Sequence, residues 1–200
     1  MTTSRSPRFR ALDLSMGWAG PLVGALLAEM GFDVVKVEDT RNFDWWRGPL
    51  NIAAPELRPI ERSPTFNTVN RGKRGITLDL ADSRGVEIVK RLAAHADVLI
   101  ENYAPGVMER FGLSYDVLAA ANPRLVMVSM PSFGTGGPES DSRGYGNTVE
   151  AMAGVTTLNR YHDAEQPYTL SNALGDPVGG LNGALGVLAA LHERERTGHG

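Results

Sequence analysis

Short apolar runs alternate along the chain with longer stretches in which apolar residues recur three or four positions apart. The runs predict five β-strands, at residues 9–15, 33–38, 74–80, 97–101 and 125–130. The stretches predict helices from Pro21 to about Met30, from Asp82-Ser83 through Ala93, from Tyr115 to Ala121, around Thr148–Gly154 and from about Val178 to Glu193. Because strands and helices alternate, we predict an α/β fold built in layers.

Local residue signals set several of these boundaries. Pro21 suits the first turn of a helix, where a backbone amide has no partner to lose, and Asp82 suits a helix N-cap. Asn122 should end a helix, because a residue that precedes proline disfavours the helical conformation. Residues 41–64 are rich in proline, tryptophan and charge without clear periodicity. We predict a loop or short helical turns there that lie over a site, with the tryptophans at 45–46 covering a cleft.

Composition narrows the classes of function. With 42% hydrophobic and 22% charged residues we expect a globular domain, and a net charge of -3 gives no general attraction to nucleic acid or anionic membranes. The absence of cysteine excludes a disulfide scaffold, a thiolate zinc site and a cysteine nucleophile. The four histidines show no metal-ligand spacing, and no apolar run reaches the roughly 20 residues of a membrane helix. The first ten residues lack the apolar core of a secretory signal, so we expect a soluble, cytoplasmic protein without a metal site.

A glycine-rich turn, Gly17–Gly24, lies between the first predicted strand and its helix. Such a turn lets the backbone approach a phosphate, and Glu38 follows about 20 residues later, where a dinucleotide-binding fold places its ribose-binding acid. The glycine spacing is not G-x-G-x-x-G, however, and Pro21 is foreign to that fingerprint. An NAD(P)-dependent oxidoreductase and glycines that only pack a helix against a strand both stay open.

Two further segments combine polar residues with a turn. Residues 70–74 carry three cations and a glycine, and could hold phosphates, although a solvated basic turn explains them as well. Residues 102–106 follow a predicted strand, at the edge where open α/β sheets bind ligands. Asn102 could hydrogen-bond a ligand there and Tyr103 could stack on a ring, with Arg110 on the next turn. A plain proline-glycine turn is the alternative for this segment.

Asp176 lies between Gly175 and Pro177 at the start of the last predicted helix. N-terminal capping is the first explanation for an aspartate in that place. A carboxylate with small neighbours, here Gly179-Gly180, could also act as a nucleophile because substrate has room to approach it. The local sequence leaves both roles open.

Taken in order, several segments resemble one known family. They are residues 12–14 with Gly20-Pro21, residues 31–38, 70–74, 100–110 and 122–125, the loop at Phe133-Gly134, Gly175-Asp176 and residues 196–200. Their order and spacing resemble the family III CoA-transferases, which include formyl-CoA transferase, carnitine CoA-transferases and α-methylacyl-CoA racemase. The resemblance runs from about Ala11 to Gly200.

The resemblance implies a Rossmann-like parallel sheet with flanking helices over residues 1–200. This would be the large, CoA-binding domain, and a smaller domain would come from later sequence. Expected substrates are an acyl-CoA and a carboxylic acid, with no permanently bound cofactor and with two full-length copies interlocked as a homodimer. Asp176 is implied as the catalytic nucleophile, which forms a mixed anhydride and then an aspartyl-CoA thioester. By position, contacts to CoA are expected from Trp18, Ala19, Val69, Asn70, Arg71, Gly72, Asn102, Tyr103, Ala104, Arg110, Pro131, Ser132, Phe133 and Gly134.

Three positions depart from formyl-CoA transferase. Trp18 replaces a glutamine near the reacting group, so we expect a different acyl pocket. Asp39 replaces a basic CoA-binding residue, and a phosphate contact is expected to be lost or moved to Arg41. Pro131 replaces a lysine.

The racemase branch of the family can be compared directly with this chain. Racemization needs two acid–base groups that flank the α-carbon, and Tyr145 stands where that branch has a histidine. A tyrosine with a pKa of about 10 is a poor base at neutral pH, so transfer is favoured over racemization. A non-catalytic CoA-binding fragment is a further alternative, because the glycine-rich loop that covers the acceptor in the family lies beyond Gly200.

Overall fold

The computed structural model describes residues 9–39, 41–48, 61–168, 170 and 173–200. Five strands form one parallel sheet in the order β3-β2-β1-β4-β5. They are β1 (Arg10–Asp13), β2 (Asp33–Glu38), β3 (Arg74–Thr77), β4 (Val98–Glu101) and β5 (Val126–Ser129). The predicted Rossmann-like parallel sheet is therefore confirmed, and its strand order reverses between β1 and β4.

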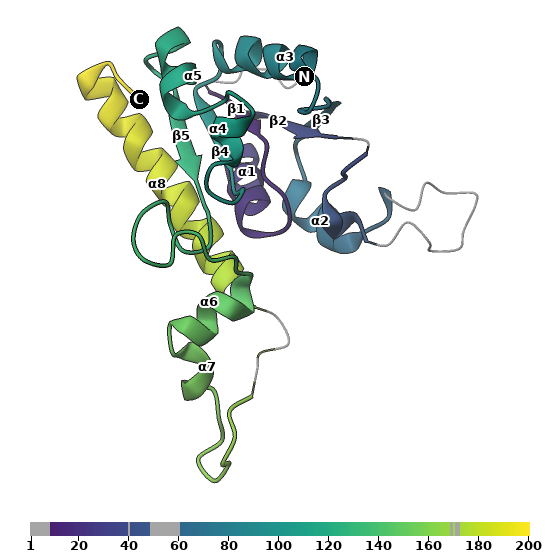
Figure 1. Ribbon diagram of the computed structural model, residues 1–200, viewed down its shortest axis with the longest axis vertical. Coiled ribbons are helices and arrows are strands. Elements are labelled where there is room, and N and C mark those ends of the chain that lie inside the picture. Colours follow the sequence, from purple (N-terminus) through teal and green to yellow (C-terminus); the bar gives the residue numbers. More distant parts are fainter. Residues whose placement is uncertain (1–8, 40, 49–60, 169, 171–172) are drawn as a thin grey trace, which may run out of the picture.

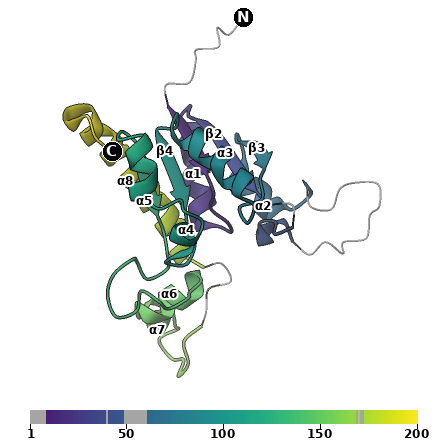
Figure 2. The ribbon, with the colours of Figure 1, turned by 45° about the horizontal axis from the view of Figure 1, so that its top comes forward.

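Helices cover both faces of the sheet (Figures 1 and 2). One face carries α1 (Ala19–Glu29) and the long α8 (Gly175–Thr197), and the other carries α3 (Ser83–Ala93), α4 (Val107–Arg110) and α5 (Tyr115–Ala121). Because side chains alternate along a strand, neighbouring residues feed the two cores. Thus Ala11 packs with Val23 and Val187 on the α1–α8 side, while Leu12 packs with Val89 on the other.

The remaining helices lie outside these two layers. In the β2–β3 connection, η1 (Trp45–Arg47) contacts α2 (Pro64–Asn70), which also packs on α1. Beyond the carboxyl ends of the strands, α6 (Gly146–Met152) and α7 (Val155–Leu158) follow β5 and form the lower part of Figure 1. The chain then returns to α8, whose first turn packs against α6.

Most predicted boundaries agree with the structure to within a few residues. The helix predicted from Tyr115 to Ala121 is α5, and Asp82 caps α3 by accepting a hydrogen bond from the amide of Arg84. Strand β3 is shorter than predicted, and α8 begins three residues before Val178. The helices α2, α4 and α7 were not predicted. Of the predicted loop at 41–64, residues 49–60 lie outside the described part of the chain.

Candidate functional site

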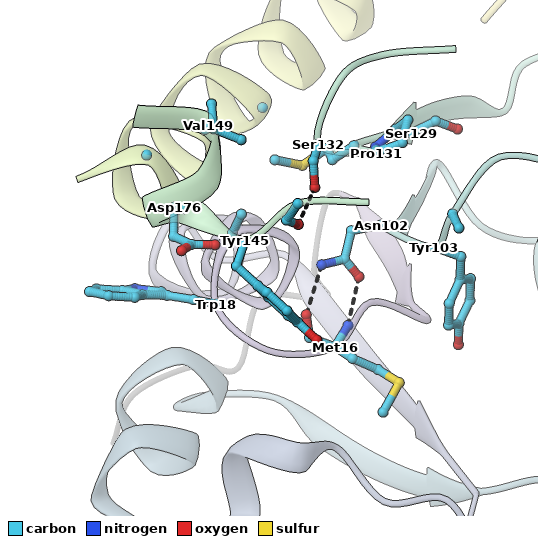
Figure 3. Close-up of a pocket in the computed structure, with 18 of the residues that line it drawn as sticks. Met16, Trp18, Asn102, Tyr103, Ser129, Pro131, Ser132, Tyr145, Val149 and Asp176 are labelled. Atoms are coloured by element: carbon cyan, nitrogen blue, oxygen red, sulfur yellow. Dashed lines mark hydrogen bonds between the residues drawn. The ribbon is translucent and has the colours of Figure 1, made fainter. Parts of the chain in front are cut away.

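A cavity of about 590 Å³ opens at the carboxyl ends of β1, β4 and β5 (Figure 3). Its place follows from the topology. The strand order reverses between β1 and β4, and the helices that follow these two strands, α1 and α4, lie on opposite faces of the sheet, which leaves a crevice that suits a ligand. The loop after β5 and the first turns of α1, α6 and α8 complete the walls.

Asp176 reaches this cavity from the first turn of α8. The helix begins at Gly175 with Leu174 as its N-cap residue, so Asp176 does not cap α8. Its half-buried carboxylate instead accepts hydrogen bonds from the backbone amides of Gly146 and Ala19, which belong to other helices. Burial raises the pKa of Asp176 above its usual value and the negative charge of Glu150 adds to this, while the two amide bonds oppose it.

The start of α6 lies directly against this carboxylate. A Cβ atom at Gly146 would lie 2.3 Å from Oδ2 of Asp176 and 2.6 Å from Cβ of Ala173. Glycine is therefore required here by space, not by backbone conformation. The absence of a side chain lets the amide of Gly146 approach Asp176 closely enough to donate its hydrogen bond.

Asn102 holds two loops of the cavity together. Its Oδ1 accepts a 2.8 Å hydrogen bond from the amide of Met16, and its Nδ2 donates a 2.7 Å bond to the carbonyl of the same residue (Figure 3). One amide N–H and one oxygen lone pair of the Asn102 side chain remain for a ligand. The two hydrogen bonds show that Asn102 connects the loop after β1 to the loop after β4.

Tyr103 lies at the end of the cavity away from Asp176 (Figure 3). Its ring contacts Phe111 edge-on, with centroids 6.3 Å apart. Burial, followed by the nearby carboxylates, raises the pKa of Tyr103, so its hydroxyl stays protonated. Tyr103 also borders a second cavity of about 310 Å³, which extends toward Glu38 and Asp39.

Aromatic side chains line the end of the cavity near Asp176. The ring centroids of Trp18 and Trp46 are 5.0 Å apart, and those of Trp45 and Tyr145 are 5.8 Å apart. Trp45 lies over Gly17, where a Cβ atom would be only 2.5 Å from the indole. Trp45 lines the cavity as expected, whereas Trp46 packs behind Trp18.

The loop after β5 closes another side of the cavity. Ser132 donates a hydrogen bond to the carbonyl of Gly144, which fixes this loop to the segment that precedes α6. The ring of Phe133 lies against Gly144, where a Cβ atom would be 2.9 Å from it. Gly134 then turns the chain with a φ of 81°, a conformation that favours glycine.

The structure brings part of the predicted CoA site together. Lining the cavity with Asp176 are Trp18, Ala19, Asn102, Tyr103, Ala104, Pro131 and Ser132. The other predicted contacts do not line it: Val69, Asn70, Arg71, Gly72, Arg110, Phe133 and Gly134. That any of these residues binds CoA stays a prediction.

Arg71 is the clearest case of a residue outside the cavity. Its Nε lies 2.5 Å from Oε1 of Glu29, the last residue of α1, whereas Ala19 at the other end of α1 lines the cavity. Arg71 is therefore bound at the end of α1 opposite to Ala19, and an 11-residue helix is about 16 Å long.

The neighbouring Lys73 belongs to a buried polar network that also holds Asp13 and Asn70. Its Nζ donates to Oδ2 of Asp13 at 2.7 Å, to the carbonyl of Pro21 at 2.7 Å and to Oδ1 of Asn70 at 2.8 Å. Burial lowers the pKa of Lys73 to about 8, against the attraction of Asp13. For Asp13, burial acts to raise the pKa, but the charges of Lys36 and Lys73 outweigh it and hold the pKa below its usual value.

The same network continues toward the cavity. Lys36 lies 3.4 Å from Oδ2 of Asp44, and Oδ1 of Asp44 accepts 3.0 Å hydrogen bonds from the amides of Gly17 and Trp46. Asp44 thus ties the loop that carries the tryptophans to the loop after β1. The ammonium group of Lys73 donates to three acceptors within the protein. It therefore stabilises the fold and is not available to bind a phosphate, although the segment at 70–74 is basic.

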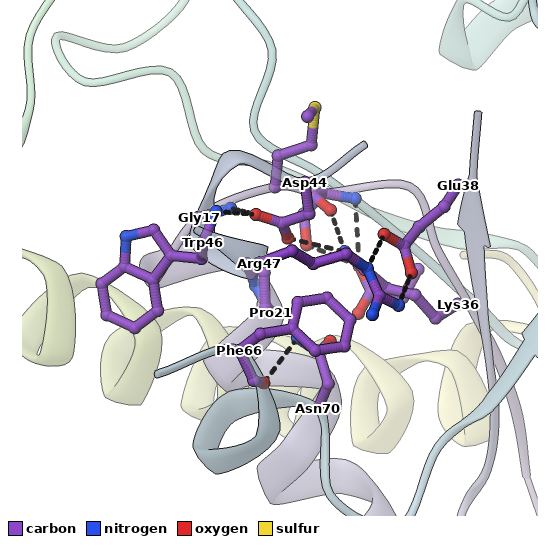
Figure 4. A network of polar contacts seen from close by, with 12 residues as sticks. Gly17, Pro21, Lys36, Glu38, Asp44, Trp46, Arg47, Phe66 and Asn70 are labelled. Carbon is purple, nitrogen blue, oxygen red and sulfur yellow. Dashed lines mark hydrogen bonds and ion pairs between the residues drawn. The ribbon is translucent and has the colours of Figure 1, made fainter. Parts of the chain in front are cut away.

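Glu38, the candidate ribose-binding acid, is held by Arg47. The guanidinium contacts both carboxylate oxygens of Glu38, at 2.8 and 2.6 Å, and lies 3.6 Å above the ring of Phe66 (Figure 4). A bidentate pair of this kind occupies the oxygens that a ribose would need. The observation disfavours the oxidoreductase alternative.

Gly175 and Gly179, noted in the sequence as small neighbours of Asp176, line the cavity, but sequence reasoning did not identify several others: Met16, Val128, Ser129, Met130, Gly144, Gly146, Val149 and Gly183. The pair of glycines around Tyr145 was the available signal, since closely spaced glycines suggest backbone packed against something. The neighbour itself, Asp176, lies 30 positions further along the chain, and no local feature of the sequence connects it to these glycines.

Two further features of the described residues concern metal ions and membranes. They contain no group of three or more histidine, aspartate or glutamate side chains placed to hold a metal ion. None of the helices in the described ranges is long and apolar enough to cross a membrane.

Comparisons with known proteins point in one direction. Residues 8–200 match the family described as CoA-transferase family III. The succinyl-CoA–D-citramalate CoA-transferase of Chloroflexus aurantiacus is 36% identical over 100% of this chain and 49% of its own length. The formyl-CoA:oxalate CoA-transferase of Rhodopseudomonas palustris is 36% identical over 96% of this chain and 43% of its own.

Solved structures agree with the sequence relatives. A CAIB/BAIF family protein from Brucella suis superposes with a TM-score of 0.87 at 37% identity, over 96% of this chain and 50% of that one. The hypothetical protein Rv3272 from Mycobacterium tuberculosis gives a TM-score of 0.84 at 34% identity, over 96% of this chain and 51% of that one. The chain spans about half the length of the curated relatives it matches.

Proposed function

Because the chain belongs to CoA-transferase family III, we propose that it is the CoA-binding part of an enzyme that transfers CoA from an acyl-CoA to a carboxylic acid. The observation that carries the proposal is the position of Asp176. Among the described residues that line the main cavity, Asp176 alone bears a charge, and it lies opposite the loops after β4 and β5. A single carboxylate in a site otherwise lined by apolar and neutral polar groups suits a nucleophile.

In the proposed reaction, an oxygen of Asp176 attacks the thioester carbonyl of the acyl-CoA. The C–S bond breaks, which gives a mixed anhydride and the CoA thiolate. The thiolate attacks the aspartyl carbonyl, releasing the donor carboxylate and leaving an aspartyl-CoA thioester. The acceptor carboxylate attacks this thioester to form a second anhydride, and the thiolate then attacks the acceptor's acyl carbon. Product acyl-CoA leaves and the carboxylate of Asp176 is restored.

The surroundings of Asp176 favour these steps. The amides of Gly146 and Ala19 fix the direction of the carboxylate, and its raised pKa makes it more basic and hence more nucleophilic. Negative charge develops on the carbonyl oxygen at each attack. The amino-terminal ends of α1 and α8 border the cavity through Ala19 and Gly175, and helix amino termini stabilise negative charge.

The proposal extends to contacts that lie beyond the described cavity. We expect CoA to contact the cavity residues of the loops after β1, β4 and β5, with its remaining part reaching beyond the cavity toward the other predicted positions. The exposed apolar side chains of α8, such as Leu181 at 57% and Leu185 at 64% exposure, suit burial against further sequence or a second copy. This supports the predicted smaller domain and interlocked homodimer. A cytoplasmic location is likewise proposed.

Covalent trapping tests the nucleophile directly. The full-length protein is incubated with formyl-CoA or succinyl-CoA, the donors named for the relatives, in the presence of hydroxylamine, and analysed by intact-mass and peptide mass spectrometry. Hydroxylamine converts an activated aspartyl group into a hydroxamate. We expect the hydroxamate at Asp176 in the wild type and in the control Asp163→Ala, an exposed position, and no hydroxamate in Asp176→Ala.

The outcomes separate the alternatives. Trapping that persists in Asp176→Ala would assign the nucleophile to another residue. A full-length protein that binds CoA but is trapped by neither donor nor any of a wider panel of acyl-CoAs would contradict the transferase proposal. It would favour the non-catalytic CoA-binding alternative. Tight binding of NAD with no binding of CoA would restore the oxidoreductase alternative.

A further inference from the structure

Glu150 is a buried carboxylate that the proposed reaction does not use. It lies on α6 with only 6% of its surface exposed. Its Oε1 accepts a 2.8 Å hydrogen bond from the backbone amide of Gly175, the first residue of α8. The first four amides of a helix have no partner within the helix. Glu150 therefore supplies from α6 a partner that α8 cannot supply to itself.

This bond lies one residue from Asp176, and the packing around it is tight. A Cβ atom at Gly175 would lie 2.9 Å from the carbonyl oxygen of Gly146, so the backbones of α6 and α8 touch without side chains between them. At the same contact, the amide of Gly146 donates to the carboxylate of Asp176. Two hydrogen bonds in opposite directions thus join the two helices: Gly175 to Glu150, and Gly146 to Asp176.

We propose that Glu150 is a positioning residue for Asp176: it fixes the first turn of α8 on α6 and places a negative charge beside the nucleophile. The proposal rests on the proposed function in taking Asp176 as that nucleophile. Glu150 does not line the cavity, so it acts through the placement and basicity of Asp176 and not by touching substrate.

The electrostatic part of the role can be derived from position. Asp176 lies in the first turn of a 23-residue helix, where the helix dipole favours the charged carboxylate and makes it a weaker base. Burial and the charge of Glu150 act in the opposite direction and raise the pKa of Asp176. In the described surroundings no other charged side chain contributes: α1 offers the Ala19 amide, and the rest of the first turn of α8 is uncharged.

Two variants separate the hydrogen bond from the charge. Glu150→Gln keeps an oxygen acceptor for the Gly175 amide and removes the charge, whereas Glu150→Ala removes both. The control Glu165→Gln removes one negative charge at an exposed position. Each protein is labelled at the aspartate carboxyl carbon and titrated by NMR, with the Asp176 signal identified by its loss in Asp176→Asn. Hydrogen exchange of the Gly175 amide is measured on the same samples.

We expect the pKa of Asp176 to fall in Glu150→Gln and to stay at the wild-type value in Glu165→Gln. We expect the Gly175 amide to exchange about tenfold faster in Glu150→Ala, the loss of one charge-assisted hydrogen bond, and at close to the wild-type rate in Glu150→Gln. An Asp176 pKa that is the same in Glu150→Gln and in the control, or Gly175 exchange unchanged in Glu150→Ala, would overturn the proposal.

Covalent trapping of the same variants tests whether the placement of Asp176 by Glu150 affects the rate of the reaction. The rate of trapping at Asp176 should be lower in Glu150→Ala at all pH values. In Glu150→Gln, the fall of the trapping rate at acidic pH should move to lower pH. The proposed function and the role of Glu150 can be contradicted separately. Wild type that is not trapped at all contradicts the proposed function, whereas the NMR and exchange measurements decide the role of Glu150 without any turnover.

Discussion

Replacing Gly146 by alanine should remove most of the activity while leaving the fold in place. The new Cβ atom would lie 2.3 Å from Oδ2 of Asp176, whereas ordinary contact begins at 3.4 Å, so the carboxylate must retreat by about 1.1 Å. Cβ of Ala173, at 2.6 Å from the same point, blocks a compensating shift of α6 in that direction. A misplacement of about 1 Å at a reacting group costs on the order of 100-fold in rate.

The assay is the rate of hydroxamate formation at Asp176 in the full-length protein, alongside CoA binding by calorimetry and unfolding in urea. Overpacking should lower the free energy of unfolding by about 1–3 kcal/mol. CoA affinity should change little, because the Gly146 contact is to the nucleophile. The matched control is Gly186→Ala on α8, where a Cβ atom meets nothing within 4 Å and helix propensity favours alanine by about 1 kcal/mol. A Gly146→Ala protein trapped within threefold of the wild-type rate would refute the reasoning.

Three further predictions concern the buried charges. Lys73→Met leaves Asp13 buried without its ion-pair partner at 2.7 Å and should lower the free energy of unfolding by about 3–5 kcal/mol in urea at pH 7; a loss below 1 kcal/mol would contradict the burial argument. With a folded-state pKa of about 8 and an unfolded value of 10.5, Lys73 binds more protons when unfolded between these limits. Wild-type stability relative to Lys73→Met should therefore rise from pH 8 to pH 10.5, and a flat difference would argue against the lowered pKa. Arg194→Met on α8 breaks the 3.0 Å pair with the partly exposed Asp97 and should lower the free energy of unfolding by about 3 kcal/mol. The control Arg196→Met changes a surface position and should leave the free energy of unfolding almost unchanged.

The sequence predicted the layers of the fold because the strands are short, apolar and separated by helices with clear periodicity. It also placed Asp176 at the start of a helix. It could not show that the carboxylate faces Gly146, since that contact joins residues 30 positions apart through backbone atoms that no side chain marks. Lys73 shows that a contact between distant residues can also remove a function that the local sequence suggests. Its basic segment is typical of a phosphate-binding loop, but its charge is neutralised by Asp13, which lies 60 positions away at the carboxyl end of β1.

The walls of the cavity come from separate segments, and two of them, the loop after β1 and the first turn of α8, are held by side chains from elsewhere in the chain. Asn102 holds the loop after β1 through the backbone of Met16, and Asp44 holds the same loop through the amide of Gly17. Glu150 holds the first turn of α8 in the same way, from α6. Bonds from side chain to backbone fix the path of a loop whatever side chains the loop itself carries. The side chains that line the cavity, Trp18 among them, can therefore change while the cavity keeps its shape, so one site geometry could accept ligands of different size.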